Sequence, residues 1–277
     1  MGDKLRVSLV QMRVTNQVVE NVNTAIELIR EAAKSKPDVV VLPENFHIMG
    51  RKSEFFEAAE TIDGPTLTTL KDLAKELELY IVAGTMYLRE DGQGKLKNTC
   101  CVINPEGEIQ DTYEKVHTFS AQIGDVAIDG SKVEEAGDKL VVTNIKGVPV
   151  GLSVCFDIRF PEMFRILALR GAKVILTPAI FLLHTGKDHW EVLLRARAIE
   201  NQVYMVAPAT FGKFPPHNEW SYGRSMVVDP WGVVTAQASD QTCVITSDLD
   251  LVYVENVRKR VPTLSRRRPD VYDWSEY

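Results

Sequence analysis

Short apolar segments alternate with amphipathic stretches along the chain. In the first third, this pattern predicts a strand at Leu5–Met12, an amphipathic helix capped by Asn16 and reaching about Ser35, a strand at Val39–Leu42, a helix at 66–79 and a strand at 80–85. The uninterrupted apolar run Val39–Leu42 is typical of a strand buried on both faces. Strands that alternate with helices in this way indicate an α/β fold.

The same landmarks return in the second half of the chain, in the same order and at similar offsets. Val174–Pro178 repeats Val39–Pro43, Tyr204–Ala207 repeats Tyr80–Ala83, and the turn Asp229–Gly232 repeats the turn Asn104–Gly107. The strand before Cys155 then corresponds to Leu5–Met12. Each half alternates strands with helices and closes with a β-hairpin. The sequence therefore predicts two pseudo-repeated halves whose sheets pack together with helices outside, a four-layer αββα sandwich.

The two halves are expected to form one domain over residues 1–277, because no linker rich in Pro, Gly or Ser separates them. A two-domain protein would need a polar hinge, and Gly130–Gly137 is the one candidate. The C-terminal segment, about 261–277, is rich in Pro, Arg and aromatic residues. This composition favours an arm exchanged between subunits over a free end.

Composition narrows the functional class. The 277 residues are 45% hydrophobic and 25% charged with a formal net charge of −6, so no overall field attracts nucleic acid. Basic residues gather at Arg258–Arg260 and Arg266–Arg268, which we interpret as a solvated tail or subunit contact rather than a polyanion site. No apolar run could cross a membrane and no signal peptide is apparent. Four cysteines without a disulfide or metal spacing then favour reduced thiols in the cytoplasm.

Three reactive side chains follow predicted strands. Glu44 comes directly after Val39–Pro43, Lys115 closes a hairpin strand, and Cys155 ends an apolar strand before the helix that Pro161 opens. Each has an ordinary alternative role, as a helix cap, a solvated lysine or a core cysteine. Together they provide a base, a cation and a thiol at one edge of the sandwich, which is what nucleophilic acyl chemistry needs.

These segments resemble a known family. Leu42–Glu44, Lys115 with His117, and Cys155–Glu162 look like the three motif blocks of the nitrilase superfamily of carbon–nitrogen hydrolases. The resemblance covers essentially the whole chain. It is closest to the branch of deaminated glutathione amidase and ω-amidase, on the evidence of His189–Asn201, Ser221–Gly232 and Arg267–Asp270.

The resemblance implies a role for each residue. Glu44 would be the general base, Cys155 the nucleophile, and Lys115 with the backbone N–H of Phe156 the oxyanion hole. The implied reaction is hydrolysis of a small linear amide, either the ω-amide of a 2-oxo acid or deaminated glutathione, to a carboxylic acid and ammonia through a cysteine thioester. No cofactor is expected. The family also implies a homodimer or larger homo-oligomer, and neither a nucleic acid nor a membrane partner.

Two positions depart from the resemblance. Glu114 stands where relatives usually have arginine, next to the proposed oxyanion cation. Many relatives also place a second glutamate in the loop that here spans 118–139, and Gly130 falls at its expected position. We expect Asp129 or Glu134 to replace it.

Other candidates are less specific. Arg159, Phe181, His189 and Trp190 are possible substrate-binding residues, although Arg159 could instead pair with an acid and Trp190 could be core packing. The spacing of His117, His184 and His189 does not suit a metal, so no metal site is expected. Alternative functions are hydrolysis of N-carbamoyl amides or of nitriles, or a catalytically retired binding or scaffold subunit.

Overall fold

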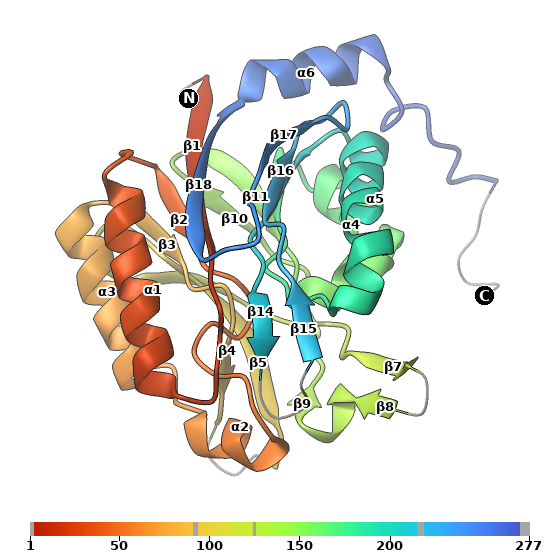
Figure 1. Cartoon of the computed structure of the whole chain (residues 1–277). Helices are drawn as coiled ribbons and strands as arrows, with labels where there is room; N and C mark the ends of the chain where they lie inside the picture. The colour runs from red at the N-terminus through yellow and green to blue at the C-terminus, as the bar shows by residue number, and fades with distance from the viewer. Residues whose placement is uncertain (1–2, 91–93, 124–125, 215–218, 272–277) are drawn as a thin grey trace.

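The structure is a computed structural model and describes residues 3–90, 94–123, 126–214 and 219–271. Two β-sheets face each other, and helices cover the outer face of each (Figure 1). The αββα sandwich predicted from the sequence is therefore confirmed.

The first sheet has the strand order β18-β1-β2-β3-β5-β4, and β6 and β9 also pair with β5. Its strands are β1 (Lys4–Gln11), β2 (Val39–Val41), β3 (Tyr80–Val82), β4 (Met86–Leu88), β5 (Leu96–Ile103), β6 (Ile109–Glu114), β9 (Glu134–Glu135) and β18 (Cys243–Asp250). The three central strands β1, β2 and β3 run parallel.

The second sheet has the order β10-β11-β12-β13-β16-β17. Its strands are β10 (Val142–Ile145), β11 (Val148–Leu152), β12 (Val174–Leu176), β13 (Tyr204–Ala207), β16 (Met226–Val228) and β17 (Val234–Gln237). Two separate hairpins, β7 (Ser120–Ile123) with β8 (Val126–Asp129) and β14 (Phe211–Phe214) with β15 (Glu219–Tyr222), lie at one end of the sandwich (Figure 1).

The pseudo-repeat is visible in strand direction and register. In each half, three parallel strands, β1-β2-β3 or β11-β12-β13, are followed by an antiparallel strand, β5 or β16. The closing hairpins, β5–β6 and β16–β17, each carry a register shift, between Val102 and Ile103 and between Val227 and Val228. The two halves predicted from the sequence are thus the same supersecondary unit used twice.

The helices of the described chain are α1 (Val18–Ala33), α2 (Lys52–Ala58), α3 (Pro65–Leu77), α4 (Pro161–Leu169), α5 (Leu183–Asn201) and α6 (Leu251–Arg260). Four helices form the outer layers, and α2 and α6 lie at the two ends of the sandwich (Figure 1). Helices α1 and α3 cover the first sheet, and α4 and α5 cover the second (Figure 1). No helix in the described part of the chain is both long and apolar enough to span a bilayer.

Alternation within β2 explains its unbroken apolar sequence. Val39 and Val41 belong to the core shared with the second sheet, whereas Val40 and Leu42 belong to the core beneath α1 and α3. Successive side chains of a strand point to opposite faces, and here both faces are covered. Burial on both sides therefore requires an apolar residue at every position.

One predicted helix cap is wrong. Helix α1 begins at Val18 with Gln17 as its N-cap residue, which makes no side-chain cap hydrogen bond. Asn16 instead donates from Nδ2 to Oε1 of Glu54 in α2, at 2.9 Å. The Asn16 side chain therefore joins the segment before α1 to α2 and does not cap α1.

The segment 118–139 is more ordered than a simple loop. It contains the β7–β8 hairpin, a short 3₁₀ helix, η1 (Gly130–Lys132), and β9. Strand β9 pairs in parallel with β5, and Gly137 N donates to Lys115 O at 2.9 Å. These bonds attach the polar stretch Gly130–Gly137 to β5 and to the residue that follows β6. Beyond α6, residues 261–271 run away from the sandwich (Figure 1), and the end of the proposed arm, 272–277, lies outside the described residues.

Candidate active site

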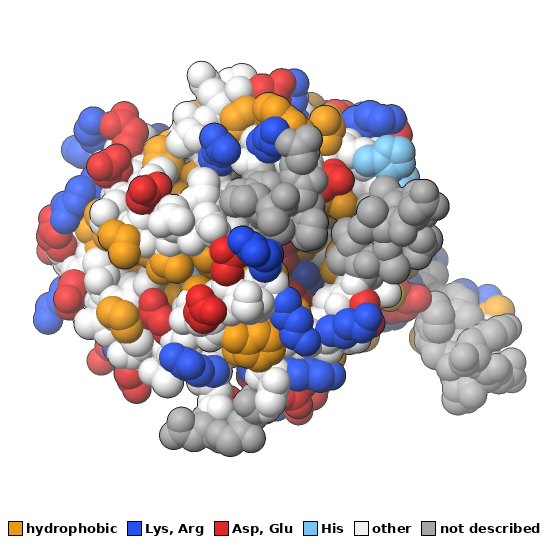
Figure 2. Space-filling view, turned by 60° about the horizontal axis from the view of Figure 1, so that its bottom comes forward, with side chains coloured by type: hydrophobic (Ala, Val, Ile, Leu, Met, Phe, Trp, Pro, Cys, Tyr) orange, Lys and Arg blue, Asp and Glu red, His pale blue; other side chains and the backbone are white. Residues whose placement is uncertain are grey.

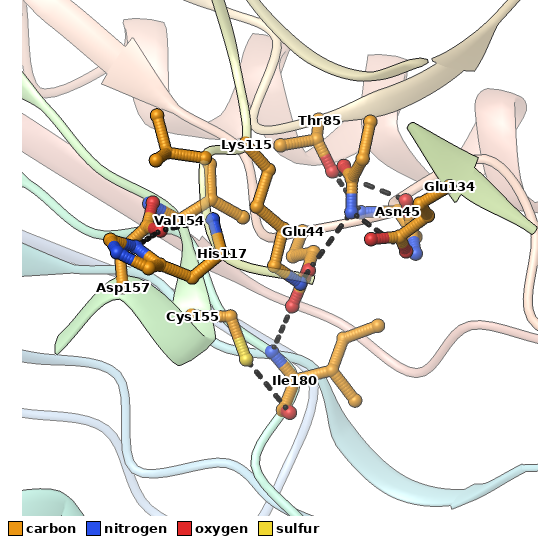
Figure 3. A network of polar contacts seen from close by, with 12 residues as sticks. Glu44, Asn45, Thr85, Lys115, His117, Glu134, Val154, Cys155, Asp157 and Ile180 are labelled. Carbon is orange, nitrogen blue, oxygen red and sulfur yellow. Dashed lines mark hydrogen bonds and ion pairs between the residues drawn. The ribbon is translucent and has the colours of Figure 1, made fainter. Parts of the chain in front are cut away.

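The three side chains singled out in the sequence meet at one end of the sandwich. Glu44 follows β2, Lys115 follows β6, and Cys155 comes shortly after β11 (Figure 3). Because β2 and β11 are central parallel strands of the two sheets, their carboxyl ends place polar residues at the seam between the sheets. Figure 2 looks onto this end, where Lys and Arg side chains gather around a hollow.

The Glu44 carboxylate is buried, with 3% of the residue exposed, and both its oxygens are hydrogen bonded. Oε1 accepts from Lys115 Nζ at 2.7 Å and from Asn98 Nδ2 at 3.2 Å. Oε2 accepts from the backbone N–H of Ile180 at 2.9 Å. These donors come from both sheets and fix the orientation of the carboxylate.

Cys155 is held beside that carboxylate. Its thiol donates to the carbonyl oxygen of Ile180 at 3.2 Å, so one residue contacts both the thiol and Glu44 (Figure 3). Burial, and then the charge of Glu44, raise the pKa of the Cys155 thiol well above its ordinary value, and the charge of Lys115 only partly opposes them. A thiol whose pKa is raised in this way needs an adjacent base for reaction.

The backbone at Cys155 is unusual. Its φ of +47° lies in the left-handed region, which residues other than glycine rarely adopt. This sharp turn begins a short 3₁₀ helix, η2 (Cys155–Arg159). The first N–H groups of a helix have no acceptor within it, so the amide of Phe156 stands next to the thiol as a donor.

Lys115 is buried between two acids. Burial lowers its pKa, but the charges of Glu44 and Glu134 outweigh this effect and raise the pKa above its ordinary value. The side chain is therefore an ammonium at neutral pH. It supplies a fixed positive charge beside the thiol.

Of the two acids considered as the second glutamate, the structure brings Glu134 to the site and leaves Asp129 outside it. Glu134 Oε1 accepts from Tyr87 OH at 2.8 Å and from Asn98 Nδ2 at 3.3 Å. Asp129 instead accepts from Ser131 N at 3.2 Å, at the start of η1. The short pairing of β9 with β5 turns Glu134 inward and leaves Glu135 exposed.

The unusual Glu114 faces away from the reacting groups. It pairs with Lys97 Nζ at 3.0 Å, and the same ammonium lies 3.8 Å from Glu135. Because successive residues at a strand end point to opposite faces, Glu114 is directed outward where Lys115 is directed inward. Its charge is balanced locally by Lys97.

Arg159 is held by aromatic rings. Its guanidinium lies 5.8 Å from the ring centre of Phe156 and 5.2 Å from that of Phe181, and Nη1 lies 3.3 Å from His189 Nδ1. Among the residues that the structure describes, no carboxylate pairs with it. Burial lowers its pKa, and the charge that a Cys155 thiolate would carry acts in the opposite direction.

The remaining substrate-binding candidates differ in exposure. Phe181 is buried at the site, and His189 is exposed on α5. Trp190 is fully buried, packs against Phe181 at 4.8 Å between ring centres, and donates from Nε1 to Arg224 O. This favours core packing among the two roles considered for Trp190. In the described ranges, no group of three or more His, Cys, Asp and Glu side chains is arranged to hold a metal ion.

Two further residues of the site, Asn98 and Tyr87, were not predicted from the sequence. The side-chain NH₂ of Asn98 donates to both Glu44 and Glu134, and the backbone carbonyl oxygen of Asn98 accepts from Lys115 N at 2.9 Å. A buried asparagine within the apolar strand β5 was the available signal. Tyr87 gave none, because it fits the apolar pattern of β4 and its function lies only in its hydroxyl.

Comparison with known proteins agrees with this geometry. The profile described as carbon-nitrogen hydrolase matches residues 6–259. The chain belongs to the carbon–nitrogen hydrolase family. It is 37% identical over 274 residues to the omega-amidase NIT2 of Xenopus tropicalis, covering 99% of this chain and 98% of that protein.

Solved structures in the family have the same fold. The NitFhit protein of C. elegans superposes with a TM-score of 0.93 at 35% identity, over 98% of this chain and 66% of the longer NitFhit chain. Nit3 of Saccharomyces cerevisiae, a member of branch 10 of the nitrilase superfamily, gives a TM-score of 0.87 at 30% identity, over 97% of this chain and 98% of its own. The family resemblance noted in the sequence is therefore confirmed, and with it the assignment to the hydrolases of carbon–nitrogen bonds.

Proposed function

We propose that the protein is a thiol amidase that hydrolyses the ω-amide of a small 2-oxo acid to the dicarboxylic acid and ammonia. The observation that carries this proposal is a buried site in which Lys115 bonds Glu44 and Ile180 bonds both Glu44 and Cys155, so that a base, a cation and a nucleophile lie together. The omega-amidases to which the chain is similar support the substrate class.

In the proposed acylation, Glu44 accepts the thiol proton as the sulfur of Cys155 attacks the amide carbon. The carbonyl oxygen becomes an oxyanion, which Lys115 Nζ and the N–H of Phe156 stabilise. Glu44 then donates its proton to the nitrogen. The C–N bond breaks, ammonia leaves, and a thioester remains on Cys155.

Deacylation uses the same groups. Glu44, again ionised, takes a proton from a water molecule that attacks the thioester carbon. The second oxyanion is stabilised in the same place, and the C–S bond breaks. The thiolate recovers the proton from Glu44, and the carboxylic acid is released.

Arg159 supports a second feature of the proposed substrate, a carboxylate. Its guanidinium lies beside the nucleophile without a carboxylate partner in the described structure, and aromatic faces hold it on two sides. A partly desolvated guanidinium binds a carboxylate strongly and in a defined orientation. We therefore expect a linear substrate that carries a carboxylate at the end opposite its amide.

The test is ammonia release over a panel containing α-ketoglutaramate, deaminated glutathione, neutral amides, N-carbamoyl amino acids and nitriles. Amides with a carboxylate should be preferred. Arg159→Met should raise their KM by about 10- to 100-fold, as expected for a lost charged hydrogen bond, while rates with neutral amides change little. Arg30→Met, which removes an exposed arginine of α1, is the matched control.

The other outcomes identify the rivals. Release only from N-carbamoyl compounds or nitriles would assign one of those activities. No release from any substrate would support a catalytically retired scaffold. Equal turnover of charged and neutral amides would contradict the role of Arg159.

Glu134 is proposed as the second glutamate of the site. We expect Glu134→Gln to lower kcat/KM by about 10- to 100-fold, because the change removes one of two charges around Lys115 and disturbs the bonds of Asn98 and Tyr87. Asp129→Asn should have nearly normal kinetics. Glu135→Gln, at the neighbouring exposed position, is the matched control. A large loss in Asp129→Asn with a normal Glu134→Gln would reverse the assignment.

We also propose that the protein is at least a homodimer that acts on a small-molecule amide. Helices α4 and α5 expose apolar side chains, with Ile166 40%, Leu169 44%, Val192 65% and Ile199 50% exposed. An apolar helix pair of this kind suits a subunit contact.

The described cysteines are all free thiols, which fits our proposal of a cytoplasmic enzyme.

Removal of residues 261–277 should weaken self-association, because the proposed arm would no longer cross to the partner. Val192→Glu on α5 should dissociate the dimer by burying a charge in the contact. Light scattering measures both. Val19→Glu on α1, where a valine is 72% exposed on the opposite outer layer, is the control. An unchanged mass in both variants would rule out this mode of association.

A further inference from the structure

Asp157 is a fully buried carboxylate close to the site but outside its reacting groups (Figure 3). Oδ2 accepts from Val154 N at 2.8 Å and from Tyr113 OH at 2.6 Å. Oδ1 accepts from the backbone N of His117 at 3.1 Å and lies 2.7 Å from His117 Nδ1. Each oxygen therefore has two partners, the usual capacity of a carboxylate.

These partners belong to two different segments. Val154 precedes the nucleophile, and Asp157 N also donates to Val154 O at 3.0 Å, so Asp157 closes the turn that contains Cys155 and Phe156. Tyr113 and His117 lie two residues before and two residues after Lys115. His117 is held further by stacking on Phe160, with ring centres 3.6 Å apart.

We propose that Asp157 is a positioning residue that fixes the distance between the two halves of the oxyanion hole, the ammonium of Lys115 and the amide of Phe156. The inference rests on the proposed thiol amidase chemistry. The two donors come from different sheets, and their spacing must match a single oxyanion to within a few tenths of an ångström. The Asp157 carboxylate bonds directly to a backbone N–H of each segment, that of Val154 and that of His117.

Asparagine cannot replace it, for a geometric reason. Each oxygen of Asp157 accepts from one backbone N–H, that of Val154 or that of His117. An asparagine offers one oxygen and one NH₂ group, so one of these N–H groups would face another donor. In Asp157→Asn, one segment must therefore move away from the other.

The test uses two reactions of Cys155, one that depends on the oxyanion hole and one that depends only on the reactivity of the thiol. Acylation of Cys155 by p-nitrophenyl acetate forms a C–S bond, expels p-nitrophenolate and passes through an oxyanion. Methyl methanethiosulfonate labels the same thiol by forming an S–S bond and expelling methanesulfinate, with no oxyanion. Mass spectrometry resolved to the Cys155 peptide distinguishes it from Cys243, which is only partly buried.

In Asp157→Asn we expect acylation to slow by about 100-fold, comparable with the loss of an oxyanion donor, and labelling to stay within about threefold of wild type. Tyr113→Phe removes one bond and should slow acylation by about tenfold with labelling unchanged. Asp111→Asn is the matched control, because Asp111 lies on β6, the same strand as Tyr113, and bonds Thr143 away from the site. Both of its rates should match wild type.

A parallel fall in both reactions would overturn the proposal, since Asp157 would then act on the thiol or on the fold as a whole. Acylation at the wild-type rate in both Asp157→Asn and Tyr113→Phe would also overturn the proposal. If Asp157→Asn does not fold, Tyr113→Phe decides by the same criteria. Wild-type protein that acylates with the ester but hydrolyses no amide would refute the proposed function and leave the positioning role standing.

Discussion

Replacement of Cys155 by alanine should lower amide hydrolysis by about 10⁵-fold or more, down to the background reaction. The variant lacks the atom that forms the thioester, and a water molecule in its place would have to attack an unactivated amide. The other groups of the site stay in position, because the Glu44 carboxylate keeps its bonds to Lys115, Asn98 and Ile180. Substrate binding should therefore persist while turnover stops.

Ammonia release measures turnover, and mass spectrometry of rapidly quenched enzyme should show an acyl adduct in the wild type and none in the variant. Cys243→Ala is the matched control, since this thiol lies on β18 opposite Gln11 of β1 and away from the site. Its kinetics should be normal. Hydrolysis in Cys155→Ala within about tenfold of wild type would remove Cys155 as the nucleophile.

Glu44→Gln should lower kcat for amides by about 10³- to 10⁴-fold, the upper range for loss of a general acid and base. The thiol needs this base because burial and the charge of Glu44 itself keep the pKa of Cys155 high. Ammonia is also a poor leaving group unless a proton is delivered to it. A glutamine would serve neither purpose, and its NH₂ group would face either Lys115 Nζ or the N–H of Ile180.

An activated ester should separate the two roles of Glu44. Its leaving group needs no proton, so Glu44→Gln should still form a thioester slowly, and the thioester should accumulate because no base activates water. Intact-protein mass spectrometry would detect it. Glu57→Gln, at an exposed position of α2, is the control. Normal amide turnover in Glu44→Gln would exclude this residue as the base.

The fold was largely predictable because its strands carry strong and repeated signals. A strand such as β2 lies between two cores and needs an apolar residue at each position, which leaves a pattern that a single sequence displays. The sequence signals for helix ends were weaker than those for strands. Asn16 has a side chain suited to capping, but its tertiary contact with Glu54 determines where it lies.

The meeting of Glu44, Lys115 and Cys155 was predictable, because each residue follows a predicted strand that ends at the same edge of the sandwich. The site was not predictable where a residue acts through register. The choice between Asp129 and Glu134 depends on how the two-residue strand β9 pairs with β5, and sequence pattern does not determine such a short pairing. The contacts of Asn98 and Asp157 likewise depend on segments far apart in the chain.

The left-handed backbone at Cys155 has a consequence for engineering the protein. A residue with a β-carbon in this conformation costs about 1 kcal/mol relative to glycine, so the backbone at this position favours glycine over the proposed nucleophile. A directed-evolution campaign that selects heat resistance alone is therefore biased toward losing the thiol at this position. Variants of this protein need to be selected for turnover and thermal tolerance together.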